Sequence, residues 1–412
     1  MAREDIVVGL DIGTSKIAAI IGNTWQGDPE KIEIIGVGHA RSEGLRKGVV
    51  VDIDLTTAAI RQAVADAELM AGEEIGSVHV GIAGGHITGQ TQHGMVAVAG
   101  EGHEITQADV DRAISAAQAI SIPVEREVLH VIPQGFVVDN QDGIKEPVGM
   151  SGIRLEAYVH IVTGAVASAQ NLVRSVYNAG ISVEDIVLEP IASAEAVLSR
   201  EEKNRGIVLA DMGGGTTDIV VYKDGALHHT AVLSLGGNHV TSDIAELLKI
   251  TQQEAERLKL HRGCAFAELV DSDDAIPIST VGGIRKPRFI YKQDLTEIIQ
   301  CRMEEMLDLI GQEIAKSHIH VPAGVVLTGG TALLDGLLEL AERTFPYPVR
   351  VGYPRPLKGL TDRVHSPIYA TGVGLVIYGA VQHHTDPKRT FIKGNLFEQI
   401  LKRMKDWFQD YF

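Results

Sequence analysis

The chain has 412 residues, 45% of them hydrophobic and 22% charged, which suits a folded protein of about two to four domains and excludes general disorder. Its formal net charge of −17 argues against a nucleic-acid-binding surface along the chain. Two cysteines, Cys264 and Cys301, are too few for a disulfide scaffold or a cysteine-built zinc site. The first residues lack an apolar signal-peptide core and no apolar run reaches roughly 18 residues, so we expect a cytoplasmic chain without a membrane-spanning helix.

Two glycine-rich turns, Asp11–Lys16 and Asp211–Asp218, are the first landmarks along the chain. Each lies between two β-branched runs that we predict as strands, and a third glycine turn, Leu327–Thr331, follows another apolar strand. The recurrence predicts a duplicated α/β domain in which each half begins with its own glycine turn. The strands predicted beside the turns are 6–10, 17–21, 206–210, 219–222 and 324–327.

Hydrophobic periodicity predicts the elements between these turns. The expected helices cover residues 55–70, 106–120, 242–260 and 294–314, with another from about residue 332 and a buried one over 369–381. The expected strands lie within 86–102 and over 128–138 and 154–163, with a loop at 140–152 and a linker at 383–394.

The residue types of the first two turns suit phosphate binding. Small residues after a buried strand let backbone N–H groups approach an anion closely, and hydroxyls and a lysine add donors. Phosphates also require a divalent cation held through carboxylates and water, for which Asp11 and Asp211 stand at matching places. An ordinary β-hairpin turn is the alternative for either turn alone, but the matched pair favours phosphate binding. Neither turn has the spacing of a P-loop or a dinucleotide fingerprint. The candidate phosphate-binding residues are Gly13, Thr14, Ser15, Lys16, Gly213, Gly214, Gly215, Thr216 and Thr217.

The three turns resemble the phosphate-1, phosphate-2 and adenosine motifs of the actin/Hsp70/sugar-kinase superfamily. That resemblance implies two similar α/β lobes with ATP and Mg²⁺ between them, and Asp11 and Asp211 near the Mg²⁺ through water. It implies that Glu189 lies near the attacking water of at most a slow ATPase, although a glutamate beside a proline at a helix start is the alternative. Glu256 and Lys259 resemble the pair that meets ribose and adenine, although an i,i+3 surface pair is the alternative. The residues expected to pack on the nucleoside are Gly329, Gly330 and Thr331.

The segments between the turns resemble the FtsA family of bacterial cell-division proteins over essentially the whole chain. Examples are Ser42–Asp52, His130–Gln134, Pro147–Leu155, Gly237–Ala245 and Pro367–Leu375. The resemblance implies an α/β, actin-like two-lobe ATPase fold with an inserted 1C subdomain and a C-terminal amphipathic helix. The implied boundaries are 1–84 and 163–203 for subdomain 1A, 85–162 for 1C, 204–235 and 306–365 for 2A, 236–305 for 2B, 366–382 for a closing helix of 1A, 383–394 for a linker and 395–412 for the membrane-targeting helix.

Such a protein binds ATP and Mg²⁺ and forms filaments on the cytoplasmic face of the inner membrane at the division site. It tethers FtsZ through the C-terminal peptide of FtsZ, and its 1C subdomain recruits later division proteins. No nucleic acid is expected as a partner. The alternatives are a PilM-like protein of type IV pilus assembly, which lacks this kind of terminal helix, and a small-molecule kinase, for which the sequence holds no substrate-site motif.

Residues 395–412 predict an amphipathic helix at the membrane surface. At about 100° per residue, the apolar residues fall in one arc of roughly 160°. A helix packed on the core is the alternative, but six of the 19 aromatic residues lie in 391–412, a density that suits a bilayer interface. Acidic and basic residues nearly cancel, so apolar burial drives the binding. The membrane-facing residues are Leu396, Phe397, Ile400, Leu401, Met404, Trp407, Phe408, Tyr411 and Phe412.

A basic patch at residues 285–292 is the candidate FtsZ-binding site. The segment carries four cations and no acid, with two aromatic residues interleaved. Arg302 follows on the next helix and resembles a family position tied to FtsZ binding. A solvated basic loop is the alternative. The predicted partner-binding residues are Arg285, Lys286, Arg288, Lys292 and Arg302.

Overall fold

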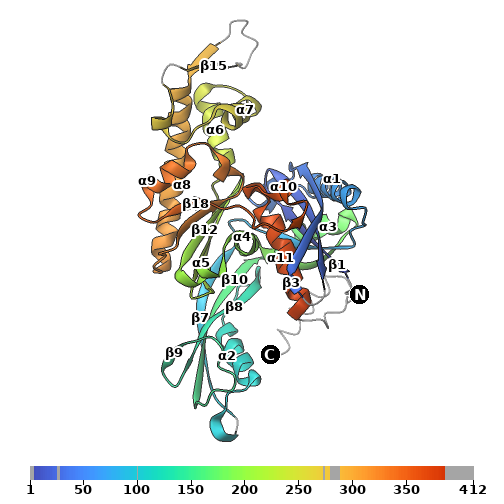
Figure 1. Ribbon diagram of the computed structural model, residues 1–412, viewed down its shortest axis with the longest axis vertical. Helices are drawn as coiled ribbons and strands as arrows, with labels where there is room; N and C mark the ends of the chain where they lie inside the picture. The colour runs from blue at the N-terminus through green and yellow to red at the C-terminus, as the bar shows by residue number, and fades with distance from the viewer. Residues whose placement is uncertain (1–3, 26–27, 100, 272–273, 279–287, 386–412) are drawn as a thin grey trace.

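The computed structural model describes residues 4–25, 28–99, 101–271, 274–278 and 288–385. These residues form two lobes, an inserted domain at one end of the molecule and a region of helices at the other end (Figure 1). The predicted membrane helix at 395–412, the linker from residue 386 onward, Arg285 and Lys286 lie outside the described residues.

The first lobe is built on a six-stranded sheet in which a β-meander is extended by parallel strands. β1 pairs antiparallel with β2 and parallel with β6, and β2 pairs antiparallel with β3. The buried runs of β1 and β2 fill a core of isoleucine, valine and leucine side chains. The order is β11-β6-β1-β2-β3-β19, with β1 Glu4–Ile12, β2 Lys16–Trp25, β3 Asp28–Arg41, β6 Ser77–Ile82, β11 Ser182–Leu188 and β19 Lys358–Gly359; the small pair β4 Leu45–Arg46 and β5 Val49–Val50 lies outside this sheet.

Helices cover both faces of this sheet. α1 (Ile53–Ala71) packs on β2, β3 and α3 (Val166–Ala179), while α11 (Ala370–Thr385) packs on β1, β2 and β6 and on the short helix α4 (Glu189–Val197). Glycines on the strands allow the close approach: a Cβ on Gly38 would lie 1.9 Å from the carbonyl oxygen of Ala63 in α1. The buried helix that we predicted over 369–381 is therefore α11.

The second lobe repeats the strand order of the first. β12 pairs antiparallel with β13 and parallel with β17, as β1 does with β2 and β6. The predicted duplication is thus present in the topology, because β14-β13-β12-β17-β18 matches β3-β2-β1-β6-β11 strand for strand. The elements are β12 Ile207–Met212, β13 Thr217–Lys223, β14 Ala226–Leu233, β17 Gly324–Thr328 and β18 Val349–Val351, with α5 Arg200–Arg205 and α9 Leu337–Thr344. The short helix α10 (Thr361–Val364) returns to the first lobe, where it contacts β3.

The inserted domain is a four-stranded antiparallel sheet with one covering helix. α2 (Gln107–Gln118) begins at a capping box in which Thr106 and Asp109 bond each other's backbone, as the predicted Thr106 cap requires. Its own small core excludes water between α2 and the sheet. The order is β7-β10-β8-β9, with β7 Thr88–Ala97, β8 Arg126–Val138, β9 Gln141–Ile144 and β10 Arg154–Ala165.

The region of helices above the second lobe contains α6, α7, the long helix α8 and a two-stranded hairpin (Figure 1). Residues 242–260, expected as one helix, form parts of two. Lys249 adopts a left-handed conformation that ends α6, and Thr251 then caps α7 by accepting the N–H of Glu254. The elements are α6 Gly237–Leu248, α7 Gln252–Arg262, β15 Ala275–Ile278, β16 Arg288–Tyr291 and α8 Lys292–Ser317.

Three other expectations were wrong in detail. The helix expected from about residue 332 begins only at Leu337, because η3 (Gly330–Leu333) is a 3₁₀ turn and Gly336 is left-handed. The loop expected at 140–152 contains β9, and α11 extends to Thr385 into the expected linker. Among the predicted subdomain boundaries, which remain predictions, 162/163 falls inside β10 and 305/306 inside α8.

Candidate nucleotide-binding site

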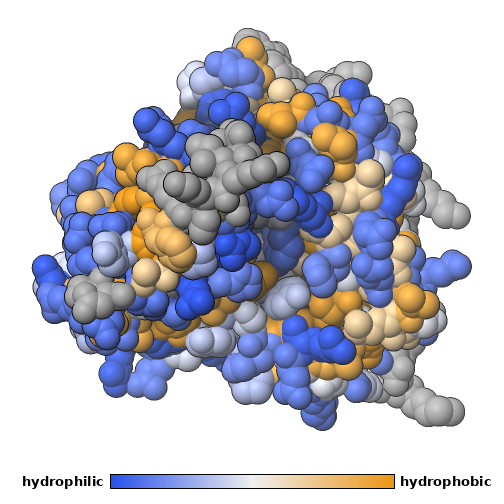
Figure 2. Space-filling model, turned by 90° about the horizontal axis from the view of Figure 1, so that it is seen from above, coloured by the Kyte–Doolittle hydropathy of each residue, from blue (hydrophilic) through white to orange (hydrophobic). Residues whose placement is uncertain are grey.

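A cleft of about 530 Å³ lies between the two lobes, within the range of small-molecule sites. Seen from above, hydrophilic residues surround a hollow between the two halves of the molecule (Figure 2). Both predicted phosphate turns line this cleft, together with the start of α6, the turn after β17 and η4 (Pro367–Tyr369). Segments more than 300 residues apart in the sequence thus meet at one site.

The two glycine turns have the same geometry and face each other. The Gly13 N–H donates to the Lys16 carbonyl at 3.0 Å, and the Gly213 N–H donates to the Thr216 carbonyl at 2.9 Å. A Cβ on Gly214 would lie 2.1 Å from the Ser15 hydroxyl, so the two turns lie in direct contact across the cleft. The turns are therefore β-hairpin turns, as the plainer alternative held, and they also line a common cleft.

Four carboxylates converge beneath the turns. Asp211 and Asp218 are direct register partners on β12 and β13, and Glu189, at the start of α4, lines the same cleft as Asp11. Burial raises the pKa of Asp211 to about 6 and that of Asp218 to about 8, and neighbouring carboxylates add to both shifts. Burial, followed by the charges of Asp11, Asp218 and Asp211, holds the pKa of Glu189 well above its usual range. A cation bound among these carboxylates would therefore reduce their mutual repulsion and stabilise the site.

These residues fit Mg²⁺ bound together with phosphates. The Asp218 Oδ1 atom is buried and has no hydrogen-bond partner among the described residues, and the Lys16 ammonium acts on Asp11, Glu189 and Asp211. No group of three or more His, Cys, Asp or Glu side chains within the described residues forms a ready cage for a metal ion. Mg²⁺ does not require such a cage, since it keeps several waters and shares its remaining positions between one or two carboxylates and phosphate oxygens.

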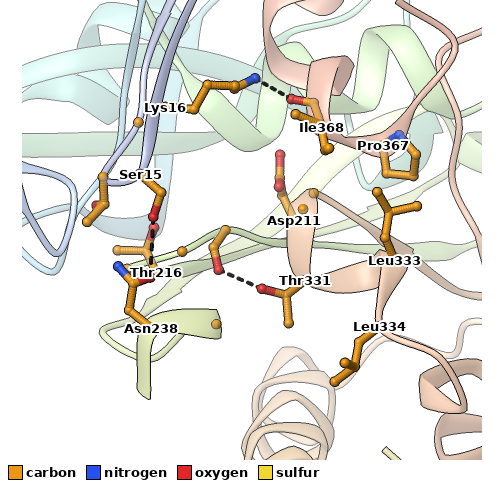
Figure 3. Close-up of a pocket in the computed structure, with 18 of the residues that line it drawn as sticks. Ser15, Lys16, Asp211, Thr216, Asn238, Thr331, Leu333, Leu334, Pro367 and Ile368 are labelled. Carbon is orange, nitrogen blue, oxygen red and sulfur yellow. Dashed lines mark hydrogen bonds between the residues drawn. The ribbon is translucent and has the colours of Figure 1, made fainter. Parts of the chain in front are cut away.

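Lys16 does not point at the opposite glycine turn. Its ammonium donates to the Ile368 carbonyl at 2.6 Å, lies 3.4 Å from Asp11 Oδ2 and stands 4.6 Å from the centre of the Tyr369 ring. Figure 3 shows the side chain extended toward Ile368. The ammonium is therefore held by Asp11 and Ile368 at the edge of the cleft that Lys16 lines.

Glu256 and Lys259 form the i,i+3 ion pair that the alternative predicted, at 2.8 Å, but they form it in the wall of the cleft. Lys259 also donates to the Gly237 carbonyl at 3.0 Å, which fixes α7 against the start of α6. Thr331 donates to the Gly213 carbonyl at 2.9 Å and joins the third glycine turn to the second (Figure 3). Apolar side chains complete this end of the cleft, and they are Val240, Leu260, Leu333 and Leu334.

Thr217 is the one predicted phosphate-binding residue that does not line the cleft. Successive side chains of a strand point to opposite faces, so Thr216 and Asp218 face the cleft and Thr217 faces away. Its hydroxyl donates to the Leu235 carbonyl at 2.9 Å and has no path to a phosphate in this arrangement.

Sequence reasoning missed several residues of the cleft. Asp218 ends the second glycine turn, and the antiparallel pairing of the two strands that flank this turn places it opposite Asp211. Asn238, whose Oδ1 accepts the Ser15 hydroxyl at 3.3 Å, and Thr371 come from helix starts that resemble the family but carry no motif for nucleotide binding. The further lining residues are Ile12, Gly48, Gly237, Gly263, Asp335, Pro367 and Ile368.

The predicted partner residues are only partly described. Lys292 begins α8, and Arg302 lies about 15 Å further along the axis at 1.5 Å per residue. The Arg302 guanidinium is already held by both oxygens of Asp243 in α6, at 2.6 and 3.0 Å, and by Glu305. Phe289 and Tyr291 are more than half exposed, as the patch requires. Arg288 lies in β16.

Two lobes of matching topology around a cleft bordered by a glycine turn from each define an actin-like fold. Solved structures agree: the PilM–PilN type IV pilus biogenesis complex aligns with a TM-score of 0.66 at 17% identity, covering 91% of this chain and 98% of the other. MreB5 of Spiroplasma citri bound to ADP aligns with a TM-score of 0.53 at 14% identity, covering 94% and 99%.

Sequence similarity then identifies the family. The cell division protein FtsA of Pseudomonas aeruginosa is 44% identical over 415 residues, covering 99% of this chain and 98% of that protein. The family model of cell division protein FtsA matches residues 208–374, and that of the SHS2 domain inserted in FtsA matches 84–163; a hydantoinase/oxoprolinase model matches 141–251. The chain belongs to the FtsA family of cell division proteins, which confirms the resemblance. The likeness to PilM shows the fold alone.

Proposed function

We propose that this cell-division actin homologue binds ATP with Mg²⁺ in the cleft between its lobes and assembles into filaments on the cytoplasmic face of the inner membrane. There it tethers FtsZ and recruits later division proteins through the inserted domain. The observation that carries the proposal is the pair of matched glycine turns that meet over four carboxylates, of which Asp11, Asp211 and Asp218 are buried. The ADP in the MreB5 structure supports nucleotide binding by an actin-like fold.

Each wall of the cleft has a role in this proposal. The N–H groups of the two turns bind the phosphates, and Asp11 and Asp211 hold Mg²⁺ through water. Glu256, Lys259 and the third glycine turn bind the nucleoside. The cation, when bound, neutralises the charge that gathers on the phosphates.

Turnover should be slow. A general base must be deprotonated to accept a proton from the attacking water. Burial and three nearby carboxylates raise the pKa of Glu189 well above its usual range, which disfavours the deprotonated form that a base requires. Binding and assembly, more than hydrolysis, are then the use of the site.

The membrane and FtsZ contacts rest on the sequence. The described residues include no helix with the length and apolarity to cross a bilayer. The amphipathic stretch 395–412 supports surface binding, reversible for one chain and firmer for a filament that presents many such helices. A peptide with acidic residues that binds at Arg302 must compete with Asp243, which favours a weak, exchangeable contact.

Electron microscopy of the purified chain on a lipid monolayer tests the proposal directly. We expect filaments with ATP and Mg²⁺, and none with Asp211→Ala, which removes a metal-side carboxylate. Calorimetric titration with ATP measures binding separately. The assignment of the cleft would be contradicted if the two single variants, Asp211→Ala and Gly214→Val, both bound ATP with the affinity of the wild type.

A further inference from the structure

The carboxylate of Asp211 is held from the opposite lobe. Ser193 of α4 donates to Asp211 Oδ2 at 2.5 Å, and Thr371 of α11 donates to the same oxygen at 3.1 Å. The two hydroxyl oxygens are 3.0 Å apart. Asp211 belongs to β12 of the second lobe, whereas α11 packs on the sheet of the first lobe and on α4, a helix that contacts strands of both lobes. The three elements α4, β12 and α11 thus meet at one carboxylate oxygen.

The helices can meet here because a glycine lies at their contact. A Cβ on Gly374 would lie 1.8 Å from the carbonyl oxygen of Ala192, so any larger residue separates α11 from α4. Ser193 and Thr371 are 0% and 7% exposed, and their hydroxyls would carry an unmet hydrogen-bonding cost without a partner. Both find that partner in Asp211.

The corresponding carboxylate of the first lobe is held differently. Asp11 has Lys16 of its own turn 3.4 Å away, five residues later in the chain. The matching position of the second turn is Thr216, whose hydroxyl donates to Asp218 at 2.9 Å. Asp211 therefore has no cation from its own turn, and the two hydroxyls of the other lobe take that place.

These contacts leave one oxygen of Asp211 for the cleft. Ser193 and Thr371 both donate to Oδ2, so Oδ1 remains available as an acceptor on a carboxylate that lines the cleft. Gly329, at φ 85°, keeps the space beside Oδ1 open, because a Cβ there would lie 2.4 Å from it.

We propose that Ser193 and Thr371 are positioning residues that orient Asp211 for Mg²⁺ and fasten the cation side of the second lobe to the first. The inference rests on the proposed function, since it takes Asp211 as a metal-side carboxylate. Groups that orient a metal-side carboxylate through hydrogen bonds typically change metal affinity by roughly 10- to 100-fold when removed. The hydroxyl pair therefore sets how strongly Mg²⁺ improves nucleotide binding, while the phosphate turns and nucleoside wall stay intact.

The test is a titration of a fluorescent ATP analogue at increasing Mg²⁺, and in EDTA, on the full chain. We expect Ser193→Ala with Thr371→Val to raise the Mg²⁺ concentration at half-maximal effect roughly 10- to 100-fold. Nucleotide affinity in EDTA should stay within about twofold of wild type. The conservative variant Thr371→Ser keeps the hydroxyl and should therefore show the Mg²⁺ dependence of the wild type. Thr371→Val alone tests the inference if the double variant does not fold.

Matched controls come from the first lobe. Ser175→Ala and Thr57→Val remove buried hydroxyls that donate to backbone carbonyls, at 2.9 and 3.2 Å, away from the cleft. Both should keep the wild-type Mg²⁺ dependence. A wild-type Mg²⁺ dependence in the Ser193 and Thr371 variants, or an equal loss of binding in EDTA, would overturn the positioning role alone. Absence of ATP binding by the wild-type chain would instead overturn the proposed function and this inference with it.

Discussion

Replacing Gly214 by valine places a side chain where the two glycine turns touch. A Cβ at this position would lie 2.1 Å from the Ser15 hydroxyl oxygen and 3.1 Å from the Ser15 Cβ, the first more than 1 Å short of ordinary van der Waals contact. The turns must move apart, and the bond from the Asn238 N–H to the Gly214 carbonyl, 2.8 Å long, is strained with them. Overpacking of this kind costs about 1–3 kcal/mol.

If that strain falls on the bound state, ATP affinity drops roughly 5- to 150-fold, because about 1.4 kcal/mol corresponds to tenfold. Isothermal titration calorimetry with ATP and Mg²⁺ measures the loss. Gly76→Val is the size-matched control, since a Cβ there meets nothing within 4 Å and its φ is not positive. An affinity within about twofold of wild type for a folded Gly214→Val protein would refute the argument that the turns close on the phosphates.

Three further predictions concern the tail, the partner patch and the pH dependence. Trp407→Glu with Phe408→Glu should release the chain from liposomes while ATP binding persists; high salt should leave the wild type bound, and retention of the double variant in a flotation assay would reject the helix. Arg302→Glu with Lys292→Glu should abolish binding of the FtsZ C-terminal peptide in calorimetry, and full-strength binding would place the site elsewhere. The free energy of unfolding of the nucleotide-free chain should fall as pH rises from about 4 to about 8, because the folded state keeps protons on buried carboxylates that the unfolded chain loses near 3.8. Asp218→Asn should flatten that slope in urea unfolding, and an unchanged slope would contradict the raised pKa.

The local chemistry of the turns was readable from the sequence. A β-branched run followed by Asp-x-Gly fixes a strand and a tight turn through steric and hydrogen-bonding preferences that act within a few residues. The capping box at Thr106 and the long apolar period of α11 are local in the same sense. Recurrence of one pattern 200 residues apart was enough to predict two similar halves.

Helix ends were predicted less well. The break between α6 and α7 depends on the left-handed conformation of Lys249, a residue without a strong preference for that geometry. Which side of a strand faces a cleft also depends on the fold. For this reason the sequence pattern wrongly predicted that Thr217 binds phosphate, and it did not indicate that Asp218 lines the cleft.

The assembled site was decided by tertiary structure. The strands, the two glycine turns and the equivalence of Asp11 and Asp211 could be predicted from the amino-acid sequence alone, because each follows from short-range geometry or from repetition. Only the packing of α11 and α4 around Gly374 brought Ser193 and Thr371 to Asp211 from positions 18 residues before and 160 residues after it. The hydrogen bonds from Lys16 to the Ile368 carbonyl and from Arg302 to the Asp243 carboxylate likewise depend on tertiary packing. Such contacts join helices and strands whose separation along the chain carries no periodic signal, and the free energy of burying polar groups with partners selects them once the lobes have packed.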